Sequence, residues 1–98
     1  MDDCSILADS MAGTNAAALL GWVTSEPLWC CNASLTPSVV CVTGRVVELQ
    51  LGSQGIRGPI GSSFSHLQML QVVDLSFNTI QGDLTFVSGL FALQWLDL

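Results

Sequence analysis

The chain repeats a pattern of apolar positions at a nearly constant spacing. Residues 46–51, 70–75 and 93–98 all read apolar-x-x-apolar-x-apolar, and the third copy begins one position earlier than an exact repeat would place it. The agreement continues downstream of the first two copies, where the matched pairs are Ile56 and Ile80, Gly58 and Gly82, and Ile60 and Leu84. A period between about 20 and 50 residues indicates a repeat protein, in which each unit buries its apolar face against its neighbours.

Within each copy, the alternation of apolar and polar residues predicts a short strand with one face in a shared core. The inward strand positions are Leu49, Leu51, Val73, Leu75, Leu96 and Leu98. The rest of the predicted core is Ile56, Ile60, Phe64 and Leu67 in the first repeat and Ile80, Leu84, Val87 and Leu90 in the second. Asn78 is expected to turn the chain by bonding main-chain groups, and Gln54 at the matching position predicts a looser turn. Gly58 and Gly82 are expected where the backbone bends.

These repeats resemble the plant-specific leucine-rich repeat, L-x-x-L-x-L-x-x-N-x-L-x-G-x-I-P, and residues 73–78 (Val-Asp-Leu-Ser-Phe-Asn) are similar to its commonest string. Gly61 replaces the usual proline of the pattern. The resemblance implies an α/β repeat fold. That fold is a leucine-rich-repeat solenoid, a right-handed superhelix with short parallel strands on its concave face and a helical, disulfide-stapled N-terminal cap. We therefore expect a cap at residues 1–42 and repeats at 43–98, divided into 46–69, 70–92 and a partial 93–98.

A cap must cover the apolar end of the first repeat. Ser5 is the expected N-cap of a helix from Ile6 to about Ala12, with acidic residues at its positive end. A further helical turn is expected at residues 16–20. Leu19 and Trp22 are then expected to anchor the cap against the first repeat.

Four cysteines in so small a chain indicate an oxidising compartment. Adjacent Cys30 and Cys31 are poor partners for each other, which leaves Cys4–Cys30 with Cys31–Cys41, or Cys4–Cys31 with Cys30–Cys41. The arrangement resembles the caps of polygalacturonase-inhibiting proteins and plant receptor-like proteins, and that resemblance implies the first pairing. A zinc site that includes His66 is the competing interpretation, which the lack of any C-x-x-C disfavours.

Catalytic chemistry is not indicated. His66 lies near Ser62, Ser63 and Ser65, but the repeat register places it on a solvated loop. The glycines at 52, 55, 58 and 61 follow the repeat and lack the lysine of a phosphate-binding loop. We therefore expect no enzyme activity, cofactor or metal, and a kinase domain, if any, would lie outside this chain.

Charge and hydropathy narrow the range of partners. The net charge of −6 disfavours nucleic-acid binding. No apolar run reaches the roughly 18 residues of a membrane span. The opening Met-Asp-Asp is acidic where a secretory signal is basic, so no signal peptide is expected within this chain. Asn32-Ala33-Ser34 is an N-glycosylation sequon, with Asn32 as the acceptor.

The expected function is extracellular recognition. The resemblance implies the N-terminal fragment of a receptor kinase or receptor-like ectodomain, secreted or at the plasma membrane, that binds a peptide or protein ligand in signal transduction and can involve a co-receptor. The predicted ligand-binding residues on the concave face are Glu48, Gln50, Val72, Asp74, Phe77, Trp95 and Asp97. The alternative is a secreted inhibitor of pectin-degrading enzymes. Because repeat proteins generally need three or more coils, we expect the isolated chain to be marginally stable or to aggregate.

Overall fold

The computed structural model describes residues 2–82 and 85–98, so Leu84, predicted for the core, lies outside the described residues. The helices are α1 (Asp3–Ser10) and α2 (Ala16–Leu20), and the short 3-10 helices are η1 (Trp29–Cys31), η2 (Ser62–His66) and η3 (Thr85–Val87). The strands are β1 (Val39–Val42), β2 (Arg45–Gln50), β3 (Arg57–Pro59), β4 (Val72–Asp74), β5 (Thr79–Gln81) and β6 (Trp95–Asp97). The chain thus combines short strands with short helices, as expected for an α/β repeat.

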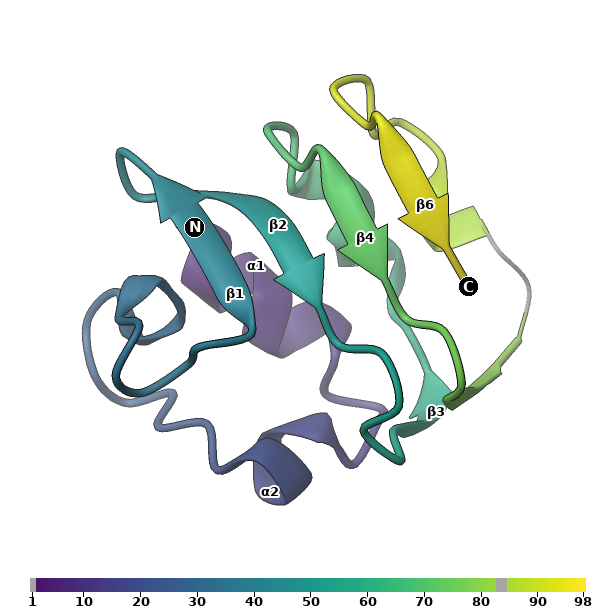
Figure 1. The fold of residues 1–98 in the computed structure, drawn as a ribbon, viewed down its shortest axis with the longest axis horizontal. Helices are drawn as coiled ribbons and strands as arrows, with labels where there is room; N and C mark the ends of the chain where they lie inside the picture. The colour runs from purple at the N-terminus through teal and green to yellow at the C-terminus, as the bar shows by residue number, and fades with distance from the viewer. Residues whose placement is uncertain (1, 83–84) are drawn as a thin grey trace.

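The repeats lie side by side in a four-stranded sheet of order β1-β2-β4-β6, with α1 behind it (Figure 1). Strands β2, β4 and β6 are parallel. Leu49 pairs with Val73 and Val73 with Leu96, and these are the matches that the sequence repeat gives. The predicted stacking of the repeats is therefore confirmed. The right-handed superhelix and the domain boundary after residue 42 stay predictions.

Strand β1 was not predicted, because residues 39–42 were assigned to the cap without a strand. It runs antiparallel to β2 and is joined to it by the two-residue turn Thr43-Gly44. Both turn residues have positive φ, 52° and 75°, and this conformation matches the twist of a tight hairpin. The cap therefore contributes a strand to the repeat sheet.

The core follows most of the predicted inward positions, with Ile80 partly buried against it. Leu49, Leu51, Val73 and Leu75 are buried. In the second repeat, however, Phe86 occupies the buried position that was predicted for the partly exposed Val87, because this repeat is shorter than the first. The Phe86 ring meets Phe64 edge-on, with ring centroids 5.4 Å apart. Leu96 and Leu98 remain 40% and 42% exposed, because β6 is the outermost strand of the sheet.

Asn78 turns the chain as predicted, and its side chain serves two repeats. Its amide nitrogen donates to the carbonyls of Leu75 (3.1 Å) in its own repeat and Leu51 (2.7 Å) in the preceding one. Its amide oxygen accepts hydrogen bonds from the main-chain nitrogens of Gln54 and Ile56, both at 3.0 Å. The turn of the first repeat is therefore completed by a side chain of the second.

The first turn is longer than the second, because Gln50 pairs with Asp74 but Arg57 pairs with Thr79, and the looser turn that Gln54 predicts stays a prediction. The small parallel pair β3–β5 matches Gly58 with Ile80, two positions before the Gly82 that the strand spacing predicts. The alignment of Gly58 with Gly82 is thus wrong as a spatial pairing. Both glycines do have positive φ, 114° and 84°, as expected for bends. Gly58 also approaches the Gly13 carbonyl so closely that a Cβ would collide with it.

Helix α1 begins earlier than predicted, because Asp2 and not Ser5 is its N-cap. The Asp2 carboxylate accepts a hydrogen bond from the Ser5 main-chain nitrogen at 2.8 Å. Asp3 is buried and joins the helix to β2, since its carboxylate accepts from the Val46 nitrogen (2.9 Å) and the Arg45 side chain (3.1 Å). The cap helix is therefore fixed to the first strand of the repeats by a charged contact.

The rest of the cap is held by aromatic packing and disulfides. Trp22 is buried against Trp29, with ring centroids 5.1 Å apart. Leu19 is 48% exposed, and its Cδ2 atom lies beside Gly55 of the first repeat. The disulfides are Cys4–Cys30 and Cys31–Cys41, which confirms the pairing that the resemblance implied.

Candidate functional site on the strand face

The outward face of the four-stranded sheet carries two rows of aligned side chains. We call Val40, Glu48, Val72 and Trp95 the cross-strand row, because each residue pairs with the next across β1, β2, β4 and β6. Gln50, Asp74 and Asp97 form a second row, two residues further along the strands. Since side chains alternate along a strand, both rows lie opposite the buried row of Leu49 and Val73. The structure thus brings six of the seven predicted ligand-binding residues onto one face.

Phe77 is the predicted residue that does not join this face. It follows β4 in a left-handed conformation (φ 57°) and is 87% exposed. Trp95 pairs with Val72, five residues before Phe77. Strand β4 ends at Asp74, so Phe77 lies in the turn that follows the strand. Phe77 is therefore not one of the paired outward residues of the sheet.

Val40 belongs to the face but was missed in the sequence. It is 40% exposed, whereas its neighbour Val39 is buried and pairs with Leu49 in the core. Three valines within residues 39–42, directly before Thr43-Gly44, were the available signal for a hairpin strand. The strand was missed because these residues were assigned to the cap.

Asp74 has a local structural role in addition to its place on the face. One carboxylate oxygen accepts hydrogen bonds from the Ser76 hydroxyl at 2.6 Å and from the Ser76 main-chain nitrogen at 3.0 Å. The Ser76 hydroxyl, followed by the main-chain bond, lowers the pKa of Asp74 below its usual value of 3.8. Asp74 therefore carries its charge at neutral pH while it shapes the turn after β4.

Two of the three serines near His66 donate their hydroxyl groups to other residues. His66 is exposed at the end of η2. The Ser63 hydroxyl donates to the Asp9 carboxylate at 2.7 Å, and the Ser65 hydroxyl donates to the Ser62 carbonyl at 2.9 Å. Both serine protons are therefore directed away from the imidazole, consistent with the solvated loop position predicted for His66.

Three cysteine sulfurs lie close together in the cap, an arrangement that also occurs in metal sites. The Sγ atoms of Cys4, Cys30 and Cys31 are within 4.8 Å of one another. Each of these sulfurs is bonded in one of the two disulfides, and the adjacency of Cys30 and Cys31 brings the two bridges together. The cluster is thus explained by the disulfides, which leave no thiolate there for zinc.

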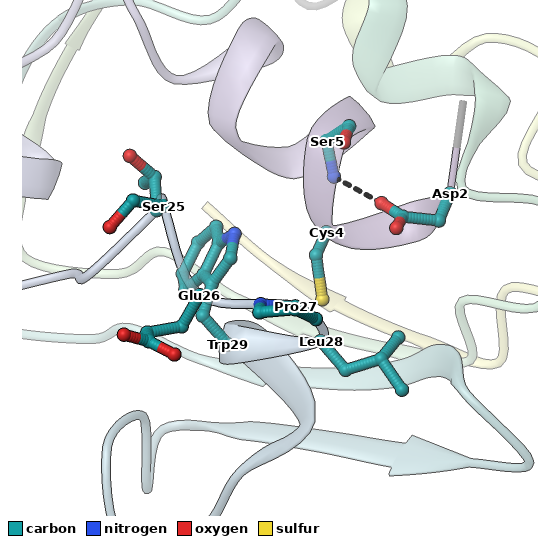
Figure 2. A pocket seen from close by; sticks show the side chains of 9 residues that line it. Asp2, Cys4, Ser5, Ser25, Glu26, Pro27, Leu28 and Trp29 are labelled. Atoms are coloured by element: carbon teal, nitrogen blue, oxygen red, sulfur yellow. Dashed lines mark hydrogen bonds between the residues drawn. The ribbon is translucent and has the colours of Figure 1, made fainter.

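A small pocket of about 180 Å³ opens in the cap, between the start of α1 and residues 24–29 (Figure 2). Figure 2 shows the Asp2 carboxylate turned toward Ser5 and the Cys4 sulfur directed at the segment that contains Leu28 and Trp29. None of its lining residues belongs to a strand. This pocket is therefore separate from the strand face.

Among the described residues, no helix combines the length and the apolar character that crossing a bilayer would require.

Comparison with known proteins relates the chain to plant receptors. No protein-family model matches it. It is 32% identical over 72 residues to Protein STRUBBELIG-RECEPTOR FAMILY 2, 46% identical over 54 residues to Receptor-like protein 41 and 34% identical over 80 residues to Phytosulfokine receptor 1, all from Arabidopsis thaliana. These matches cover 74%, 55% and 80% of this chain. The chain spans only 10%, 6% and 8% of the lengths of these relatives.

A solved structure shares the fold. It is the leucine-rich-repeat ectodomain of the plant membrane receptor kinase GASSHO1/SCHENGEN3 from Arabidopsis thaliana, in complex with CASPARIAN STRIP INTEGRITY FACTOR 2. The match has a TM-score of 0.71 and 26% identity, and it covers 98% of this chain and 12% of the ectodomain. Together with the stacked repeats and the disulfide-bonded cap, these similarities show that the chain is a plant-type leucine-rich-repeat protein, homologous to the leucine-rich-repeat receptors of plants.

Proposed function

We propose that the chain is a recognition module of a leucine-rich-repeat receptor ectodomain and binds a peptide or protein ligand outside the cell. The observation that carries this proposal is the strand face, on which three parallel repeats and the cap strand present aligned outward side chains, including the half-exposed Trp95. Exposed aromatic side chains commonly carry interface energy. Further support comes from the related GASSHO1/SCHENGEN3 ectodomain, whose structure was solved in complex with CASPARIAN STRIP INTEGRITY FACTOR 2.

An extracellular location is part of this proposal. Two disulfides in a 98-residue chain are typical of oxidising compartments. The sequon residue Asn32 is exposed, and its amide oxygen accepts from the Ser34 main-chain nitrogen at 3.0 Å. We expect secreted chain to lose mass on treatment with a peptide N-glycosidase, and the Asn32→Gln and Ser34→Ala variants not to. If the secreted wild-type chain has the mass of the unmodified polypeptide before treatment, glycosylation at this site is contradicted.

We also propose that recognition is not coupled to catalysis within this chain. The support is the arrangement around His66, where the neighbouring serine hydroxyls donate to other groups. A kinase or other domain elsewhere in a longer protein would be compatible with this role.

The proposed function can be tested by ligand capture. Oxidised chain is immobilised and exposed to extracellular fluid from the tissue that produces it, and retained peptides and proteins are identified by mass spectrometry. Each candidate is then synthesised, and its affinity is measured by calorimetry for the wild type and the Trp95→Ala variant. We expect Trp95→Ala to weaken binding at least about fivefold, as for an aromatic contact within an interface.

Phe91→Ala is the matched control, because Phe91 is 91% exposed but belongs to no strand. Retained molecules whose affinity is equal for wild type and Trp95→Ala would contradict a strand-face site. The alternative function, inhibition of pectin-degrading enzymes, predicts that the chain slows a polygalacturonase in a reducing-sugar assay.

A further inference from the structure

The cross-strand row places one carboxylate between apolar side chains. In order across the sheet it reads Val40, Glu48, Val72 and Trp95. We propose that this row binds an extended peptide segment that lies across the strands, with a basic side chain opposite Glu48 and apolar side chains over Val72 and Trp95. The inference rests on the proposed ligand-binding function and specifies the ligand's chemistry and the contribution of the cap.

The apolar members of the row provide the contact area. Val40 and Trp95, at its two ends, are 40% and 49% exposed, and Val72 between them is partly exposed. Neighbouring strands are about 4.8 Å apart, so the row is roughly 14 Å long. An extended peptide rises about 3.3 Å per residue, and about five residues therefore cover it. Because Val40 comes from β1, the peptide would contact the cap strand as well as the repeats.

The charges on this face favour a basic ligand. Glu48 lies in the cross-strand row, and Asp74 and Asp97 lie directly across from each other in the second row. Like charges on paired strands repel, and a cation above them relieves that repulsion. The guanidinium of Arg45, although Arg45 also belongs to β2, is bonded to the buried Asp3. Electrostatic complementarity of this kind selects the partner more than it raises affinity.

The arrangement fits a peptide better than a metal ion. Glu48 has valines as its row neighbours on both sides, so no second carboxylate joins it within the row. One oxygen of Asp74 is already occupied by two hydrogen bonds from Ser76. A hard cation needs several oxygen ligands around one point, whereas a lysine or arginine on an apolar peptide needs one carboxylate and apolar contacts.

The test is selection from a library of displayed random heptapeptides on the immobilised, oxidised chain. We expect selected peptides to carry Lys or Arg flanked by apolar residues. One of them is then synthesised and titrated into isotope-labelled chain, with amide shifts followed by NMR. The amides of Val40, Glu48, Val72 and Trp95 should shift, and Glu48→Gln should raise the dissociation constant about two- to fivefold, as for an exposed ion pair. Raising the salt concentration should also raise the dissociation constant, because salt screens the attraction between the charges.

Glu26→Gln is the matched control, because Glu26 lines the cap pocket and lies outside the strand face. A second peptide with norleucine in place of its basic residue should bind wild type and Glu48→Gln equally. The inference is overturned if selected peptides lack a basic residue, if Glu26→Gln weakens binding as much as Glu48→Gln, or if the shifts fall on the cap pocket. In each of these outcomes the proposed ligand-binding function still stands. If no peptide is selected and no extracellular ligand is captured, both the proposed function and this inference are rejected.

Discussion

Asn78→Ala removes a side chain that two repeats share. The deleted amide bonds the main-chain nitrogens of Gln54 and Ile56 and the carbonyls of Leu51 and Leu75, at distances of 2.7–3.1 Å. Alanine leaves these four groups without their partner. The partly buried groups among them cannot all regain a hydrogen bond from water.

The expected loss of stability follows from these contacts. A hydrogen bond contributes about 0.5–1.5 kcal/mol net, so four of them contribute roughly 2–6 kcal/mol. Water reaches the exposed side of the turn at Gln54 and recovers part of this. We expect the free energy of unfolding to fall by about 2–4 kcal/mol, which is a large loss for a chain that is expected to be marginally stable by itself.

The assay is equilibrium unfolding in urea, followed by tryptophan fluorescence with the disulfides oxidised. Gln54→Ala is the control, because the exposed Gln54 side chain makes one hydrogen bond, to the Gly52 carbonyl at 3.1 Å. It should cost less than about 0.5 kcal/mol. Asn78→Asp keeps an acceptor for the two nitrogens but directs oxygen at two carbonyls, and should destabilise at least as much as Asn78→Ala. If a variant is already unfolded in the absence of urea, the urea midpoints of that variant and of the wild type are both measured in a stabilising osmolyte and compared. Equal stabilities of Asn78→Ala and Gln54→Ala would refute the reasoning.

Three further outcomes are expected from the same unfolding assay. Gly58→Ala should cost at least about 2 kcal/mol more than Gly82→Ala, because both have positive φ but only Gly58 has main-chain atoms where a Cβ would lie; equal costs would contradict the close packing of cap and repeat. Replacing Cys31 and Cys41 together with serine should cost about 2–3 kcal/mol for a separation of 10 residues, and an unchanged midpoint would exclude a stabilising role for this bridge. The pKa of Asp2 is held below 3.8, mainly by the main-chain nitrogen at the start of α1, so its contribution is present above that value and is lost as the pH falls through the lowered pKa. Asp2→Asn should therefore reduce the loss of stability between pH 5 and pH 2, and identical pH profiles would show that this cap does not contribute.

The sequence was sufficient for features that depend on periodicity. The repeat spacing places Leu49 beside Val73 and Val73 beside Leu96, because each alternating segment has only one apolar face to bury. Asn78 was predictable for a related reason, since its amide offers both a donor and an acceptor to a tight turn. The outward strand residues then follow from alternation alone.

Features that depend on length differences between repeats were not predictable in the same way. The sequence assigned Val87 to the core, whereas this shorter repeat buries Phe86 and leaves Val87 partly buried against the core. The N-cap was misassigned because Asp2 and Ser5 are both good capping residues, and the choice depended on where Asp3 could reach β2. Whether the strand face binds a ligand is a question of partners, which a single chain's periodicity does not contain.

The antiparallel direction of β1 makes the two edges of the sheet different. A leucine-rich coil adds to a sheet as a parallel strand whose apolar side chains continue the same core, and β6 offers such a neighbour. On the other side β1 runs the opposite way, so a strand added there in the direction of the repeats would pair antiparallel, unlike the parallel pairs that join the repeats. Repeats can thus be added beyond β6 by the same parallel pairing without a change in the hairpin that joins the cap to the first repeat.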